Sequence, residues 1–195
     1  MKLYSIFLLT LLFSCNIKSK SQQELTVGNN AISNPTQKQY SFFNDQLLIT
    51  SDVKPYEEDG KKSVSDFTLP LYTDIKKYSF PNLIPQGLMS ITVAEFKDRD
   101  SALSAKEQLN EIIKMNENQD VFKIHFDSPK LAQREPFLGY WSKGRTFVNG
   151  KESTFMYVGV LTDQKILITV LTVYDDPGNL DIINKMISSI KRNLK

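Results

Sequence analysis

Hydrophobic and polar residues alternate along the chain with two different periods. Apolar runs predict strands over residues 46–53, 64–71, 88–96 and 121–127; the third run is rich in β-branched residues and the fourth alternates with a two-residue period. A charged turn at residues 57–62 separates the first two strands, and a loop punctuated by Pro81 and Pro85 precedes the third.

A helical period occupies the stretch between the third and fourth of these strands. We predict a helix over residues 101–116, with Asp100 in place to cap its first turn. Its apolar positions, which recur at helical spacing, are Ala102, Ala105, Leu109, Ile112 and Ile113.

The clearest local signal is a hairpin in the C-terminal third. Two strand patterns, 137–148 and 151–161, flank Asn149-Gly150, which suits a two-residue type I′ turn because both turn positions need a positive φ. The register that follows from this turn pairs Val148 with Lys151, and Trp141 with Val158.

The strands after that turn are apolar on both faces, in residues 154–161 and again in 165–174. Such strands must be covered on both sides, so we expect them at the centre of a sheet that lies between layers. Pro177 follows Asp175-Asp176 near the first turn of a closing helix. The apolar stripe of that helix is Leu180, Ile183, Ile187, Ile190 and Leu194. The order of elements predicts an α+β fold, a central antiparallel sheet with helices packed on it.

The N-terminus has a different composition. Residues 1–14 comprise a basic Lys2, an apolar run and the small residue Ser14, the pattern of a secretory signal peptide. The apolar run is too short to cross a bilayer as a helix. Residues 16–38 are polar and have no hydrophobic period, so we expect a flexible tether that leads to a single globular domain over 39–195.

The end of the signal segment, Leu12-Phe13-Ser14-Cys15, resembles the lipobox of bacterial lipoproteins. That resemblance implies cleavage before Cys15 and acylation of its thiol, which would anchor residues 15–38 and the domain to a membrane. The alternative is an unmodified cysteine buried in an uncleaved helix. Asn16, which follows the cysteine where enteric bacteria use Asp to retain lipoproteins in the inner membrane, favours the outer membrane.

Three further stretches resemble the PsbP-like α/β/α sandwich, a superfamily that includes the DcrB lipoproteins of bacteria and the photosynthetic PsbP subunits. They are ITVAEF leading into helix 101–116, the long strands between Tyr140 and Tyr174, and the closing IINKMISSIKRNL. The resemblance implies a binding, assembly or accessory domain and supplies no catalytic residues.

The residues that carry chemistry are few. The net charge of +2 falls to +1 without residues 1–14, which gives no electrostatic footprint for nucleic acid. With one His and one Cys, the composition predicts neither a metal site nor a cofactor. His125 lies in an alternating strand, where a structural role competes with that of a general base. Most aromatic side chains are explained by packing, and if there is a partner-binding patch we place it at Tyr140, Trp141 and Arg145.

Three functions remain open at this point. The first is a non-enzymatic envelope lipoprotein that acts as a binding or assembly module for a protein partner. The second is an immunity-type lipoprotein that neutralises a toxin in the periplasm. The third is a hydrolase whose site combines scattered carboxylates with His125. An exposed apolar patch near Trp141 would favour the first two, and a pocket that holds His125 beside a carboxylate would favour the third.

Overall fold

The structure is a computed structural model. It describes residues 37–58, 72–97, 105–117, 123–134, 136–163 and 165–194. Residues from Gln37 onward form one compact unit, Gln37–Lys195. The predicted signal peptide, Cys15 and nearly all of the tether lie outside the described residues, as do the expected strand 64–71 and the capping residue Asp100.

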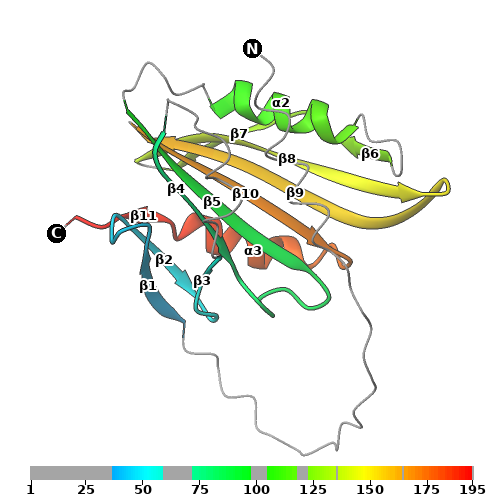
Figure 1. The fold of residues 1–195 in the computed structure, drawn as a ribbon. Helices are drawn as coiled ribbons and strands as arrows, with labels where there is room; N and C mark the ends of the chain where they lie inside the picture. Colours follow the sequence, from blue (N-terminus) through cyan, green and yellow to red (C-terminus); the bar gives the residue numbers. More distant parts are fainter. Residues whose placement is uncertain are drawn as a thin grey trace, which may run out of the picture. The chain divides into compact units, whose positions relative to one another are not determined.

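A large antiparallel sheet forms the middle layer of this unit (Figure 1). In spatial order its strands are β3 (Tyr56–Glu57), β4 (Tyr72–Ser79), β5 (Leu88–Phe96), β10 (Ile166–Tyr174), β9 (Lys151–Asp163), β8 (Phe137–Val148) and β6 (Lys123–Phe126). A further strand, β7 (Lys130–Arg134), pairs with β8 along the same edge as β6. The predicted central strands, β9 and β10, do lie in the interior of the sheet.

Different elements cover the two faces of the sheet. The helix α2 (Ala105–Glu117) packs over β6, β8 and β9 on one face. The other face carries α3 (Asn179–Ser188) and a small sheet of β1 (Lys38–Phe42), β2 (Leu47–Ser51) and β11 (Lys191–Arg192). The α+β architecture predicted from the sequence is therefore confirmed.

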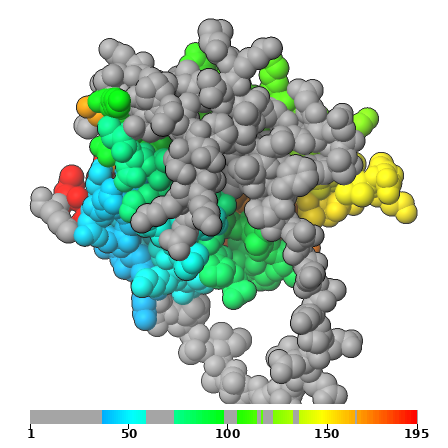
Figure 2. Space-filling model, viewed as in Figure 1, coloured from blue at the N-terminus to red at the C-terminus, as the bar shows by residue number. Residues whose placement is uncertain are grey.

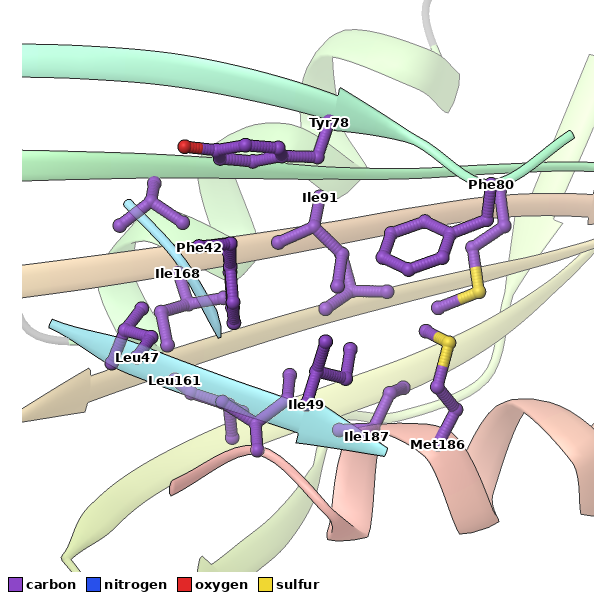
Figure 3. Close-up of a cluster of buried hydrophobic side chains, with 14 of the residues drawn as sticks. Phe42, Leu47, Ile49, Tyr78, Phe80, Ile91, Leu161, Ile168, Met186 and Ile187 are labelled. Carbon is purple, nitrogen blue, oxygen red and sulfur yellow. The ribbon is translucent and has the colours of Figure 1, made fainter. Parts of the chain in front are cut away.

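A hydrophobic core cluster lies between the main sheet and the layer made by α3 and the small sheet (Figure 3). Ile168 of β10, Ile49 of β2 and Ile187 of α3 bring the three elements together, and each is at most 3% exposed. Burial raises the pKa of the Tyr174 hydroxyl at the end of β10, so this tyrosine stays neutral in the core.

The predicted hairpin turn is present, with positive φ at Asn149 (51°) and Gly150 (76°). Val148 pairs with Lys151 as expected, but Trp141 lies opposite Gly159 and not Val158. The register shifts because β9 has a β-bulge: two of its residues, Ser153 and Thr154, lie opposite the single Thr146 of β8. The backbone N–H of Thr154 donates to Thr146 Oγ1 at 2.9 Å, which holds the bulge in place.

The closing helix is shorter than its hydrophobic stripe predicts. It ends at Ser188, and the chain then forms β11 against β2, so that Leu194 is 91% exposed. Arg192 Nε donates to Asp163 Oδ2 at 2.6 Å, which attaches β11 to the end of β9. Lys191 and Arg192 are therefore strand residues and do not extend the helix.

Besides the two-residue strands β3 and β11, three strands were not predicted, because their sequences carry a weak alternation. β4 reads YTDIKKYS and lies where a loop was expected, β7 reads KLAQR and follows Pro129, and β1 reads KQYSF in the predicted tether and domain boundary. Each pairs with a neighbouring strand of the fold, so tertiary pairing outweighs local propensity in these segments.

The β1–β2 turn supplies a test of the core. Phe43 is 1% exposed with φ 50°, and its backbone N–H donates to the Tyr78 hydroxyl at 2.9 Å. Tyr78→Phe leaves this buried donor without its partner, so we expect a loss of about 1–3 kcal/mol in the free energy of unfolding by urea. Tyr56→Phe, at a site 59% exposed, is the control and should change stability by less than about 0.5 kcal/mol. Equal stabilities of the two variants would contradict this role of Tyr78.

Candidate binding surfaces on the two faces of the β8 strand

The residues predicted to bind a partner do not form one patch. Successive side chains of a strand point to opposite faces, and Tyr140 and Trp141 are neighbours in β8. Tyr140 faces α2, because Lys106 Nζ lies 6.0 Å from its ring centroid. Trp141 packs against the core cluster that includes α3, and Arg145 follows it four residues later on the same face. The strand thus presents two separate surfaces.

The surface on the α2 face is apolar, and we call it the Leu138 surface. It consists of Leu131, Leu138 and Tyr140, with Lys106 of α2 at its border. Leu131 of β7 lies directly opposite Tyr140, and Leu138 lies two residues before Tyr140 along β8. Leu131 is 56% exposed and Leu138 is 49% exposed. Adjacent exposed leucines beside a tyrosine are typical of an interaction surface.

The surface on the other face combines aromatic rings with cations, and we call it the Trp141 surface. It consists of Lys130, Trp141, Lys143 and Arg145, and the buried ring of Tyr157, 3% exposed, lies directly beneath it. The indole of Trp141 stacks on the Tyr157 ring, with centroids 5.5 Å apart and an interplanar angle of 15°. The ammonium groups of Lys130 and Lys143 lie 5.3 and 5.8 Å from the indole centroid, within the range of cation–π attraction.

A glycine of β9 makes this stacking geometry feasible. Gly159 pairs with Trp141 across the strands, and a Cβ at position 159 would lie 3.0 Å from Cε1 of Tyr157. The absent side chain leaves room for the Tyr157 ring to lie over the glycine and beside the indole. The bulge in β9 sets this pairing, since without the register shift Val158 would lie opposite Trp141.

Arg145 extends the Trp141 surface toward the tip of the β8–β9 hairpin, which projects at one side of the space-filling view (yellow in Figure 2). Its guanidinium lies 3.7 Å from the carboxylate of Glu152, and the two side chains are 59% and 44% exposed. An ion pair so exposed to water contributes little to stability. Its position instead makes Arg145 accessible to a partner.

His125 lies on β6 opposite Arg145 and is exposed. Its ring contacts the Phe147 ring, with centroids 5.3 Å apart. Among the residues that the structure describes, no carboxylate is within hydrogen-bonding distance of His125. Over the same residues, no three His, Cys, Asp or Glu side chains gather in a way that could hold a metal ion. No helix of the described part is long and apolar enough to cross a membrane.

Comparisons with known proteins identify the fold. No protein-family model matches the chain, and no curated protein matches it. The solution structure of cyanobacterial PsbP (CyanoP) from Synechocystis sp. PCC 6803 is similar, with a TM-score of 0.59 and 15% identity over 86% of this chain and 97% of that chain. A crystal structure from Bacteroides thetaiotaomicron is similar with a TM-score of 0.52 and 13% identity, over 82% of this chain and 49% of that one.

The chain is therefore a layered α+β sheet protein. Its particular fold is PsbP-like. The resemblance seen in the sequence is confirmed at the level of the fold. At 13–15% identity these similarities establish the fold alone.

The sequence revealed only part of the two surfaces. Tyr140, Trp141 and Arg145 were singled out as aromatic and basic residues of one strand, whereas Leu131, Lys130 and Lys143 were not. Leu131 and Lys130 belong to the unpredicted strand β7, so their position beside β8 could not be read from the sequence. The alternation of β8 was the signal that separates Tyr140 from Trp141.

Proposed function

We propose that this protein is a non-enzymatic lipoprotein of the bacterial envelope that binds a protein partner through the Leu138 surface. The observation that supports the proposal is the pair of exposed leucines, Leu131 and Leu138, beside Tyr140 on a sheet face that α2 covers only in part. Leucines without a binding role are usually buried or replaced by polar residues. The clustering of these two beside an aromatic ring favours an interface.

The fold is consistent with this role. A PsbP-like sandwich is compatible with a binding or assembly module that has no catalytic function. In this proposal the chain is acylated at Cys15 and tethered through residues 16–37 to a membrane, with the outer membrane favoured by Asn16. Lipidation keeps the module at the envelope, where the partner is also expected.

Substitution of the exposed leucines tests the proposal. We expect Leu131→Ser/Leu138→Ser to reduce capture of the partner from the native envelope by at least about tenfold, because both side chains would lie at the centre of the interface. Leu88→Ser/Ile182→Ser, at sites 56% and 39% exposed elsewhere on the unit, is the matched control and should capture the partner as the wild type does.

Capture is measured by quantitative mass spectrometry of cross-linked envelopes, with the unfolding transition of each variant recorded to confirm that it is folded. A partner that is retained by the leucine variant, or lost equally by the control, would contradict the proposed interface. If the partner lost by the leucine variant is a toxin, the module is an immunity protein.

A further inference from the structure

The Trp141 surface differs in chemistry from the Leu138 surface on the other side of the sheet. Lys123, Lys130, Lys143 and Arg145 lie on the same face of the sheet, on the neighbouring strands β6, β7 and β8. Two acidic residues lie near these four cations: Glu152 forms an ion pair with Arg145, and Asp127 continues β6 directly opposite Lys143, with its backbone N–H donating to the Lys143 carbonyl at 2.7 Å. Among the described residues, no ion pair is found for Lys123, Lys130 or Lys143.

This concentration of cations is not a consequence of the overall charge. Residues 1–36 contain three lysines and one glutamate, so the compact unit that follows has 21 basic and 21 acidic residues. The formal charge of the unit is therefore zero, and the positive charge of the Trp141 surface is a local feature. A local field of this kind attracts an anionic partner.

The geometry of the surface indicates what kind of anion. The cations are carried by adjacent antiparallel strands, which space them over a sheet face, and the half-buried ring of Trp141, which stacks on the buried ring of Tyr157, lies among them. Tryptophan is a side chain that favours the boundary between lipid headgroups and hydrocarbon. Basic residues beside such rings are typical of proteins that lie on an anionic lipid surface.

The N-terminal segment is long enough for the Trp141 surface to reach the membrane in which the lipid anchor would lie. Between Cys15 and the first residue of β1, Lys38, lie 22 residues, and a flexible polar chain of that length would span about 26 Å on average. A domain held at that distance meets the membrane at an effective concentration in the millimolar range. A weak electrostatic attraction is then sufficient to orient it.

We propose that the Trp141 surface docks on the anionic phospholipid headgroups of the membrane that carries the lipid anchor. The orientation rests on the anchor of the proposed function, whereas the affinity for headgroups belongs to the folded unit alone. Docking through this face leaves the Leu138 surface, on the opposite face of the sheet, directed away from the bilayer. The protein then links a membrane on one side to a partner on the other.

Trp141 is the one tryptophan of the chain, so its fluorescence reports directly on this surface. The compact unit Gln37–Lys195, without lipid, is mixed with vesicles of phosphatidylcholine containing phosphatidylglycerol, and with vesicles of phosphatidylcholine alone. We expect co-sedimentation and a blue shift of the Trp141 emission with the anionic vesicles only. Both should be reversed by high salt, because screening weakens exposed electrostatic contacts.

The charge variant is Lys130→Gln/Lys143→Gln, which leaves the reporter in place. Its affinity for the anionic vesicles should be about 30-fold lower than that of the wild type. The matched control, Lys106→Gln/Lys114→Gln, removes the same charge from α2 on the other face and should bind as the wild type does. The unfolding transitions of both variants are measured to confirm the fold.

Equal binding to the two kinds of vesicle, equal binding by the charge variant and the wild type, or an equal loss in the control would overturn the proposal. An absence of vesicle binding together with cross-linking of the Trp141 surface to an acidic protein would also overturn it. None of these outcomes affects partner capture through Leu131 and Leu138, so failure here and failure of the proposed function can be told apart.

Discussion

Replacing Cys15 with alanine is expected to move the protein from the membrane fraction to the soluble periplasmic fraction. Acyl chains bind the bilayer through their buried methylene groups, at about 0.8 kcal/mol each, and two or more chains make the attachment stable. The alanine variant keeps the charges of the Trp141 surface, whose attraction to headgroups is screened over about 3 Å in 1 M salt. A wash at high salt should therefore release the variant and leave the wild type bound.

The design must exclude one artefact. An uncleaved signal segment would itself hold the chain in the membrane, so the Cys15→Ala variant carries the signal peptide of an ordinary secreted protein in place of residues 1–14. The control is Ser19→Ala in the tether, which leaves the cysteine and its own signal peptide intact. If the processed Cys15→Ala product stayed in the membrane fraction after the salt wash, lipidation would not be the anchor.

The second large effect is expected in the core. Ile168 is fully buried in the central strand β10, with Val93 of β5 and Leu161 of β9 as its cross-strand neighbours. Ile168→Ala removes side-chain carbons from the packed face of the sheet that α3 covers and leaves a cavity there. The free energy of unfolding should therefore fall by about 2–5 kcal/mol. With a urea m-value of about 2 kcal/mol/M, the midpoint should fall by about 1–2.5 M.

A graded series distinguishes loss of packing from other causes. Ile168→Val should cost only about 0.5–1.5 kcal/mol, because it removes a single methyl group. Ile182→Ala, at a site 39% exposed on α3, should change stability by about 0.5 kcal/mol or less. A cost for Ile168→Ala no larger than that for Ile182→Ala would show that β10 is not at the centre of the core.

Where local sequence signals are strong, they predict the fold well. The strand 88–96 has the bounds of β5, and the Asn149-Gly150 turn and its first pair, Val148 with Lys151, are as predicted. These signals succeed because a period-2 run of β-branched residues and a dipeptide that accepts positive φ both act within a few residues.

The failures have long-range causes. The register of Trp141 depends on a bulge opposite Thr146. The residues of the hairpin turn do not predict a bulge in the middle of a strand. The closing helix ends at Ser188 because the following residues pair with β2, more than 130 residues earlier in the chain. Apolar periodicity alone could not predict that Ile190 is buried outside the helix while Leu194 is exposed.

The two surfaces show the same division between local and long-range information. Lys143 could be placed on the face of Trp141 from the alternation of β8, whereas Lys130 reaches the indole only because β7 pairs with that strand. Leu131 and Leu138 become neighbours through the same pairing. A surface built from two strands is visible only when their pairing is known, and β7 carried too weak a pattern to be predicted.

Site-specific photo-cross-linking in living cells tests the proposed interface most directly. A photo-reactive residue replaces Leu138 in one variant and Ile182, an exposed position of α3, in another. We expect position 138 to cross-link to one protein of the envelope and position 182 to give no such product. If neither position gave a product, or if both gave the same one, the Leu138 surface would not be the site at which this protein binds its partner.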